Sequence, residues 1–347
     1  MTDMNWTLQP LTHASTDWRA DWDRLAETEY AGLPIVAADF CAALLQHFAP
    51  RAALLARLVE SGQTQGLAIL EVAGAGLRLY RPEQAPMPML VLRHGDGQAA
   101  QRLRALAHAL PWRRPLLNLL SQDPAFGGLT EADLARIGGR ALPYGTTIHA
   151  DLGAGFEAYW AARSKKLRDN IKRYRKRAEA EGHRIELRCH DAPQHMTADV
   201  ADYGLIESSG WKGREGTALH PDNVQGRFYA DVMLRYAQRG RARTYSLWFG
   251  DRKVAARLAL AGPQSLVFLK TTYDEAYANF AAGRLLLHAV LEHVAGERSI
   301  ARVEFYTKAN QDMLEWASGQ RDIIDVELYR AEWVGRLLGM LRRLRRV

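Results

Sequence analysis

The run Leu266–Leu291 constrains the fold of this chain more than any other stretch. It opens with Leu266–Lys270, a short apolar segment typical of a buried strand, and continues through a polar loop over Thr271–Ala278. After Gly283, leucine and valine recur at helical spacing, so one face of a helix belongs to the core. A polar loop that leads into a helix N-terminus offers free backbone N–H groups and a favourable dipole to an anion. The stretch therefore predicts either an ordinary strand-to-helix crossover or an anion site.

Further strands and helices are expected around this run in the second half of the chain. Strands are predicted over residues 184–189, 242–249, 253–261, 301–305 and 323–329, and helices over 198–209, 224–238 and 309–318. The turn Gly250–Arg252 suits a hairpin between two of these strands. The predicted order is thus a hairpin, a third strand, a loop, a helix, a strand, a helix and a last strand.

The first half of the chain also mixes strands with helices. Apolar runs separated by glycine-containing turns predict strands, and Leu103, Leu106 and Leu110 share one face of a helix. The mixture predicts an α/β or α+β fold with a mixed sheet. The histidines before residue 150 are scattered, and residues 1–149 contain no recognisable catalytic cluster. Composition changes at Asp151–Gly155, so we expect one domain over residues 1–149 and a second over residues 150–330.

Composition and motifs limit the classes of function. A net charge of +7 over 347 residues favours phosphate, nucleic-acid or anionic-membrane partners, although arginine-rich chains are often basic without such a partner. Cys41 and Cys189 match no redox or metal spacing, which favours a reducing, cytoplasmic setting. We recognise no signal peptide and no apolar run long enough to span a membrane. Phosphate-loop, dinucleotide-binding and zinc-protease motifs do not occur, and we expect no metal.

A strongly basic helix is predicted just after the domain boundary. Its apolar stripe repeats at intervals of seven, four, three and four, and the helix ends near Gly182; the stripe consists of Trp160, Leu167, Ile171, Tyr174 and Ala178. The other faces carry nine cations between residues 163 and 177, with Asp169 the only acid among them. We interpret this face as binding anions, such as cofactor phosphates, a nucleic acid or lipid headgroups; the alternative is a solvated face.

The order of elements in the second half resembles the core of the GNAT acyltransferases. Four segments are similar to the bacterial CelD-type family in particular: Ser164–Asn170, Trp211–Leu219, Lys270–Glu275 and Ala282–Leu286. That family is often found with cellulose and other exopolysaccharide genes, and it is related to the Fem-type peptidoglycan aminoacyltransferases, whose chains hold two GNAT-like halves. The resemblance extends over residues 150–329 and implies a two-lobed fold, with the C-terminal half the more complete.

The resemblance also implies a reaction. An amine or hydroxyl of a small-molecule or glycan acceptor would attack the thioester of acetyl-CoA or another acyl-CoA directly, without a covalent enzyme intermediate. The acid and base candidates are Asp274, Glu215 and Tyr273, with Glu275 and Tyr306 as alternatives. The cofactor-binding candidates are Lys270, Gly283 and Arg284, and the substrate-binding candidates are Trp211, Lys212, Lys165 and Arg168.

One segment departs from the GNAT pattern. Typical members carry an Arg/Gln-x-x-Gly-x-Gly/Ala loop for the CoA pyrophosphate, whereas this chain has Phe280–Leu285, which keeps only the middle glycine. Two alternatives therefore remain beside acyl-CoA chemistry. One is a Fem-like transferase that uses aminoacyl-tRNA, held by the basic helix. The other is a non-catalytic module of exopolysaccharide assembly.

The C-terminal residues 331–347 are predicted to form a basic amphipathic helix. Trp333, Leu337 and Leu341 belong to its apolar side, and arginines fill the other. Such a helix suits peripheral attachment to the inner face of an anionic membrane, or docking on its own domain.

Overall fold

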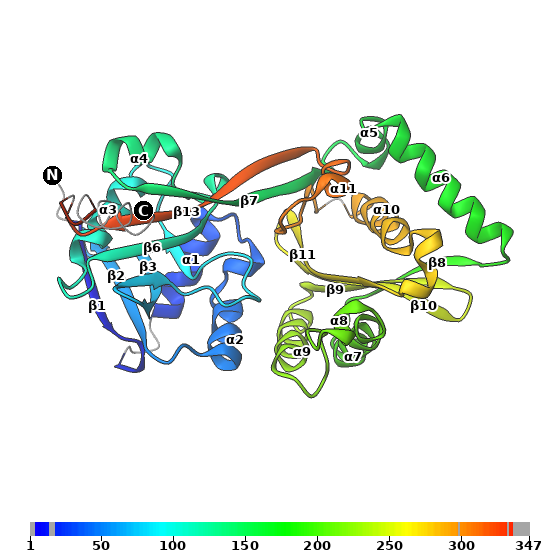
Figure 1. Ribbon diagram of the computed structural model, residues 1–347, viewed down its shortest axis with the longest axis horizontal. Helices are drawn as coiled ribbons and strands as arrows, with labels where there is room; N and C mark the ends of the chain where they lie inside the picture. The colour runs from blue at the N-terminus through cyan, green and yellow to red at the C-terminus, as the bar shows by residue number, and fades with distance from the viewer. Residues whose placement is uncertain (1–3, 14–17, 298, 332, 336–347) are drawn as a thin grey trace, which may run out of the picture.

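A computed structural model describes residues 4–13, 18–297, 299–331 and 333–335 (Figure 1). Within these residues thirteen strands form one mixed sheet, flanked by helices, in agreement with the predicted α/β class. The strands before residue 152 are β1 (Asn5–Pro10), β2 (Ala53–Glu60), β3 (Gln63–Ala73), β4 (Gly76–Leu79), β5 (Leu90–Leu92), β6 (Leu116–Gln122) and β7 (Arg140–Asp151). Those that follow are β8 (Ile185–His190), β9 (Ala242–Phe249), β10 (Arg252–Ala261), β11 (Ser265–Tyr273), β12 (Arg302–Glu304) and β13 (Gly319–Tyr329).

The sheet has the same pattern when it is followed inward from either edge. The order β1-β2-β3-β4-β6-β13 comes from one edge and β8-β9-β10-β11-β12-β7 from the other, with β5 attached to β3. In both halves the first four strands are antiparallel, and the next step, β4 to β6 or β11 to β12, is parallel. The molecule therefore consists of two halves of similar topology.

The two halves exchange their last strands. β7 ends the N-terminal half in sequence but pairs with β12, while β13 ends the C-terminal half and pairs with β6. β7 and β13 pair with each other over Arg140–His149 and Gly319–Glu327, and together they bridge the halves (Figure 1). The domain boundary expected at residue 150 thus falls inside β7, and residues 319–329 lie in the sheet between β6 and β7.

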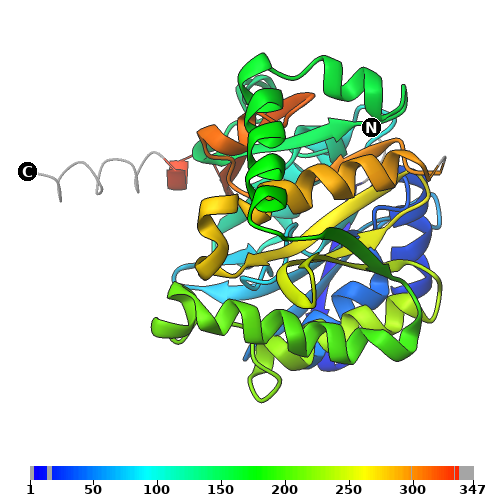
Figure 2. The ribbon, with the colours of Figure 1, turned by 90° about the vertical axis from the view of Figure 1, so that its right-hand side faces the viewer.

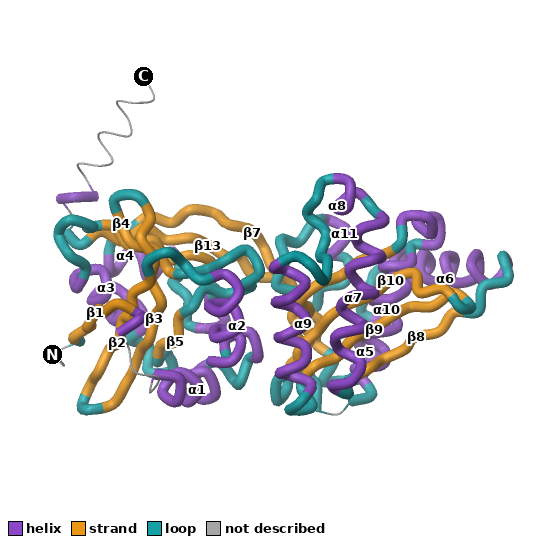
Figure 3. Tube along the Cα trace, turned by 90° about the horizontal axis from the view of Figure 1, so that it is seen from below, coloured by secondary structure: helices purple, strands orange, loops and turns teal. Residues whose placement is uncertain are grey.

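One face of the sheet carries a core that both halves share. It is covered by α1 (Trp18–Glu29), α2 (Ala38–Phe48), α7 (Pro193–Ser209) and α9 (Val224–Ala237). α2 packs against α9 where the halves meet (Figure 3). Fully buried Phe228 on α9 contacts Phe40 and Phe48 edge-on, and the hydroxyl of Tyr236 donates a hydrogen bond to the carbonyl of Pro34 at 2.7 Å. These contacts make the junction between the halves part of the core.

The opposite face is covered separately in each half. α3 (Ala99–Ala109) and α4 (Glu131–Ile137) lie on the N-terminal half, while α5 (Phe156–Ala161), α6 (Lys165–Ala180), α10 (Ala282–Ala295) and α11 (Gln311–Leu314) lie on the C-terminal half. α6 begins at Ser164, whose hydroxyl accepts a hydrogen bond from the Leu167 N–H, as an N-cap does. It crosses α10 with its buried Leu167 and Ile171 inward (Figure 2).

Several local predictions differ from the structure. The polar loop expected over Thr271–Ala278 is shorter, because β11 continues to Tyr273 and pairs Thr271, Thr272 and Tyr273 with β10. Threonine and tyrosine favour strands, so the polar character of this segment was a weak signal for a loop. A 3₁₀ segment over Glu275–Phe280 follows. The predicted amphipathic tail lies outside the described residues from residue 336 on. No helix within the described part of the chain is long and apolar enough to cross a membrane.

Candidate functional site

The site begins where two parallel strands separate. β11 and β12 pair only over Ser265–Val267 and Arg302–Glu304, after which β12 ends and β11 runs on to Tyr273. Within the described residues, the edge of β11 beyond Val267 therefore has no strand partner on this side. Leu269 is an extra residue in the ladder with β10, since Phe268 pairs with Ala259 and Lys270 with Leu258. A bulge of this kind disrupts the ladder and redirects backbone groups, here at the point of separation.

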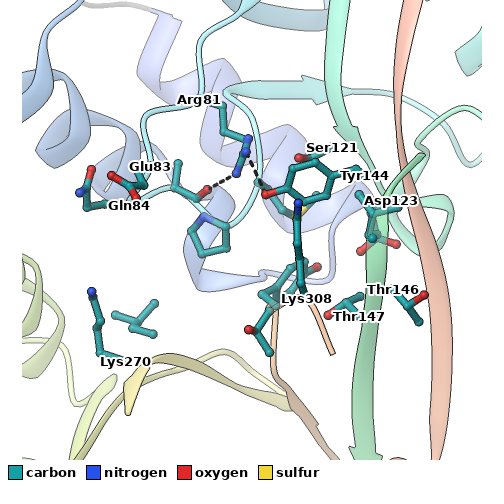
Figure 4. A pocket seen from close by; sticks show the side chains of 18 of the residues that line it. Arg81, Glu83, Gln84, Ser121, Asp123, Tyr144, Thr146, Thr147, Lys270 and Lys308 are labelled. Atoms are coloured by element: carbon teal, nitrogen blue, oxygen red, sulfur yellow. Dashed lines mark hydrogen bonds between the residues drawn. The ribbon is translucent and has the colours of Figure 1, made fainter. Parts of the chain in front are cut away.

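A cavity of about 630 Å³ lies on the side of this opening that faces the N-terminal half. Figure 4 shows its polar lining, which comes from both halves. Arg81, Ser121 and Tyr144 belong to the N-terminal half, and Lys270 and Lys308 to the C-terminal half. The Tyr144 hydroxyl accepts a hydrogen bond from Arg81 at 3.0 Å, and the Lys308 ammonium lies 4.1 Å from the centroid of the same ring. The cavity thus suits a polar ligand.

A second hollow, of about 420 Å³, lies under α10 and α11. It is lined by the edge of β11, by the first residues of α10 including Gly283, and by Leu287 and Trp316. Leu269, Lys270, Tyr306 and Thr307 line both this groove and the inter-half cavity. The two hollows therefore meet where β11 and β12 separate.

A buried ion cluster holds the ends of the strands around this opening. Arg321 on β13 donates hydrogen bonds to both carboxylate oxygens of Asp123, at 2.8 and 2.9 Å, and to Glu304 at 2.9 Å. The side chains of Asp123 and Glu304 are each 1% exposed. Burial by itself lowers the pKa of Arg321, but its hydrogen bond to Asp123 and the nearby charges raise that pKa above its ordinary value. Arg321 is thus a permanent cation that connects the segment after β6 with the end of β12.

Tyr306 lies beside this cluster in a strained conformation. Its φ is +42°, uncommon for a residue other than glycine, and its hydroxyl oxygen is buried without a hydrogen-bond partner. Burial raises the pKa of Tyr306 well above its ordinary value, and Asp123 and Glu304 add to this effect. The phenol therefore keeps its proton at any physiological pH and can act as a hydrogen-bond donor.

The structure brings five of the predicted residues to the two hollows, including the alternative candidate Tyr306. Lys270 and Tyr306 line both, Glu215 lines the inter-half cavity, and Gly283 and Arg284 line the groove. Arg284 also forms ion pairs with Asp312 at 3.0 Å and Glu315 at 3.4 Å, which hold α10 against α11.

The other predicted residues line neither of these two hollows. Asp274 caps the 3₁₀ segment through the Ala276 N–H at 3.0 Å and pairs with Arg252 at 2.8 Å. Tyr273 is 46% exposed and packs beside Gly283. Lys165 and Arg168 lie in the first turn of α6, where Arg168 donates to the carbonyls of Ala161 and Arg163. Trp211 and Lys212 belong to α8 (Trp211–Arg214), and their side chains lie outside the described structure. The roles of these residues in catalysis and binding stay predictions.

Sequence reasoning missed the residues that the N-terminal half and β13 contribute. These are Arg81, Ser121, Asp123, Tyr144 and Arg321. Asp123 and Arg321 are 198 residues apart in the chain, so no local pattern connects them. Within the described residues no cluster of histidine, cysteine or acidic side chains could hold a metal ion.

Comparison with protein-family models finds a match in the second half of the chain. Residues 165–313 match the family model described as acetyltransferase (GNAT) domain. No curated protein matches the chain. The fold is similar to the crystal structure of FemX, with a TM-score of 0.58 at 10% identity over 96% of this chain and 99% of that one.

Two further solved structures share the fold. A tandem GNAT protein from the clavulanic acid biosynthesis pathway has a TM-score of 0.53 at 16% identity, over 94% of this chain and 99% of its own. L-PGS from Bacillus licheniformis has a TM-score of 0.52 at 13% identity, over 84% and 91% of the two chains. The tandem neighbour agrees with the repeated strand order described above. Residues 165–313 therefore resemble an acetyltransferase (GNAT) domain, and the chain is built from two halves of GNAT-like fold.

Proposed function

We propose that this protein transfers an acyl group, in the simplest case acetyl, from acyl-CoA to an amine or hydroxyl of a polar acceptor. The donor would lie in the groove under α10, and the acceptor would lie in the cavity between the halves. The polar lining of that cavity supports a small-molecule or glycan acceptor, and the sequence resemblance supports one from envelope or polysaccharide biosynthesis. We place the reaction in the cytoplasm.

The observation that carries this proposal is the meeting of the two hollows. Both are lined by Leu269, Lys270, Tyr306 and Thr307, so a thioester at the separation of β11 and β12 is accessible from the acceptor side. The N-terminus of α10, which has no side-chain cap, suits the CoA diphosphate. Holding two reactants in attack geometry is a large part of what a direct transfer requires.

Named side chains suit the proton transfers. The acceptor nitrogen or oxygen attacks the thioester carbonyl carbon and gives its proton to Glu215, directly or through water. The new bond to carbon forms as the C–S bond breaks, the leaving thiolate accepts a hydrogen bond from the Tyr306 phenol, and the proton taken by Glu215 reaches the thiolate through water. Backbone N–H groups at the Leu269 bulge are the candidates to bind the oxyanion.

Calorimetry and a thiol-release assay test the proposal. The protein should bind CoA and acetyl-CoA, and Glu215→Gln and Tyr306→Phe should lower turnover with a suitable acceptor about 10²-fold or more while leaving CoA affinity within a few-fold. Glu157→Gln, in the first turn of α5, is the matched control and should behave like the wild type. Absence of CoA binding at millimolar concentration would refute the proposal.

A second candidate is transfer of an aminoacyl group from tRNA. The cations of α6 from Lys165 to Arg177 form no ion pair within the described residues, and the fold is similar to that of FemX. Under this proposal tRNA binding should weaken steeply with salt, and reversing the charges of Lys172, Arg173 and Lys176 should abolish it. Retention of tRNA by that variant would exclude this second candidate.

Attachment to an anionic membrane is a further proposal, to be tested with vesicles and a chain that lacks residues 336–347.

A further inference from the structure

One arginine in the C-terminal half is buried without a counter-ion. Arg257 lies in the middle of β10, is 6% exposed, and forms no hydrogen bond or ion pair through its guanidinium with any described residue. Other buried arginines in this molecule are paired. Arg102 is 1% exposed and meets Glu60 at 2.8 Å and Asp96 at 2.7 Å, and Arg321 meets Asp123 and Glu304. Arg257 therefore differs from these arginines, because no acidic side chain among the described residues pairs with it.

The Arg257 side chain lies in the groove under α10. Its neighbours at alternate positions, Ala255 and Ala259, belong to the core on the α10 face, and Arg257 lines the groove together with Gly283. The guanidinium carbon lies 3.9 Å from the centroid of the Phe268 ring, and that ring packs edge-on against Phe305 at 5.1 Å. Stacking thus holds the guanidinium in place, and its donor groups are left for a ligand.

An uncompensated buried charge is costly, so its position needs a reason. Burial lowers the pKa of Arg257 to about 9, and the side chain is thus still a cation at neutral pH. A methionine or leucine of similar size would fill the same space without this cost. The cation becomes favourable once a bound group supplies the missing negative charge.

The segment that leads into this groove has one glycine, Gly283, whereas a typical GNAT phosphate loop has a further glycine or alanine two residues later. Ala281, in a left-handed conformation with φ +51°, and Ala282 precede Gly283 at the start of α10. Gly283 and Arg284 of this turn and Arg257 line one groove. A guanidinium provides several donors in a planar fork, which matches phosphate and carboxylate oxygens.

We infer that Arg257 binds an anionic oxygen group of the acyl donor, and so compensates for the reduced phosphate loop at Gly283. The group is either a phosphate of the carrier or a carboxylate at the end of the acyl chain. The inference rests on the proposed function, because it assumes that the donor lies in this groove.

Calorimetry with four anionic ligands, and with pantetheine as the uncharged control, tests the inference on the full chain. The wild type should bind inorganic pyrophosphate, CoA, acetyl-CoA and succinyl-CoA, and Arg257→Met should weaken binding of pyrophosphate and of all three CoA ligands about tenfold or more. Pantetheine, which has no phosphate, should bind both proteins equally. Loss confined to succinyl-CoA would assign Arg257 to an acyl carboxylate instead. Equal affinity of Arg257→Met and wild type for every anionic ligand would overturn the inference.

Matched variants separate binding from folding. Arg243→Met removes a partly buried arginine of the neighbouring strand that pairs with Glu297 outside the groove, and it should leave all four affinities unchanged. Without ligand, Arg257→Met should melt at the wild-type temperature or above it, whereas Arg102→Met should melt below it. Arg257→Lys keeps the charge and should lose part of the pyrophosphate affinity, which provides a second folded variant.

The two proposals fail in different ways. If the wild type binds pyrophosphate through Arg257 but does not bind CoA, the acyl-CoA function falls while the anion site stands. If the wild type binds CoA and Arg257→Met binds it equally well, the function stands and the role of Arg257 falls. Failure of the wild type to bind any of the four anionic ligands overturns both.

Discussion

At the scale of single residues, the environment of His288 shows how burial sets protonation. It lies on α10, 8% exposed, with its ring edge-on to Trp160 at 4.6 Å and to Phe156 at 5.1 Å. Its Nδ1 has no hydrogen-bond partner, and the nearest carboxylate oxygen, of Glu292, is 3.8 Å away. Burial, together with the positive charge of Arg175, lowers the pKa of His288 to about 4. The folded protein therefore holds this imidazole neutral.

This shift predicts a loss of stability in mild acid. The unfolded chain protonates its histidines near the ordinary pKa of about 6.5, whereas the folded chain protonates His288 only near 4, so protons favour unfolding between these values. The free energy of unfolding should fall by about 3 kcal/mol through His288 as pH drops from about 6.5 to 4. Urea unfolding at several pH values measures the slope.

The matched variants identify the source of that slope. His288→Leu should flatten the pH dependence in this interval. His293→Leu, which replaces an exposed histidine of the same helix, should keep it. An unchanged slope in His288→Leu would assign the acid sensitivity to other groups.

At the scale of elements, the contact of α2 with α9 connects the halves through apolar packing. Phe228 is fully buried between Phe40, Phe48 and the ring of His47, with ring centroids 5.2 to 6.0 Å apart. The His47 ring also meets Asp231 at 3.0 Å on the next turn of α9. A junction of this kind behaves like the interior of a domain, where lost volume is not refilled.

Phe228→Ala should therefore destabilise the whole molecule. The expected cost is about 3–5 kcal/mol, from lost burial and the cavity left behind. Chemical denaturation measures it, and a single transition at lower denaturant indicates that both halves unfold together. Val224→Ala, at the exposed start of α9, is the control and should cost less than about 0.5 kcal/mol. Two separate transitions in the Phe228 variant would contradict a shared core.

At the scale of the whole molecule, the exchange of β7 and β13 makes the halves interdependent. In the single sheet β7 lies between β13 and β12, and β13 lies between β6 and β7, so each half needs a segment from the other to complete its strand order. Residues of both exchanged strands, Tyr144–Thr147 of β7 and Ile323 of β13, line the inter-half cavity (Figure 4). Folding of the two halves and formation of the inter-half cavity are thus coupled.

Cutting the chain after Ala150 tests this coupling. Residues 151–347 alone lack β7 and the α2 partner of α9, and residues 1–150 alone lack β13, so each fragment should lack a cooperative thermal transition. Co-expression should restore a soluble one-to-one complex, since the exchanged strands can pair again. Circular dichroism and size-exclusion chromatography report both outcomes. A soluble fragment of residues 151–347 with its own cooperative transition would refute the interdependence.

Local sequence patterns predicted much of the fold and picked out several residues that line the two hollows. Apolar periodicity placed the strand at Leu266 and the helix after Gly283 near their observed positions, because the face that an element buries is encoded at local spacing. The basic helix is α6, but Trp160, which was expected on its apolar stripe, belongs to the separate helix α5. The order of elements indicated a GNAT-like core, which the family model confirms for residues 165–313. Lys270, Glu215, Gly283, Arg284 and the alternative Tyr306 line the two hollows, and their roles there stay predictions.

Only the tertiary structure decided which distant residues meet. The exchange of β7 and β13, the ion cluster of Arg321 with Asp123 and Glu304, and the isolation of Arg257 all depend on strand pairing between segments far apart in the chain. Such pairing is selected by the burial of whole faces against each other, and local spacing carries no record of the partner. The sequence by itself determined the elements and their buried faces. The strand order determined the cavity between the halves and the cations that line it. It also determined the groove in which Arg257 has no counter-ion among the described residues.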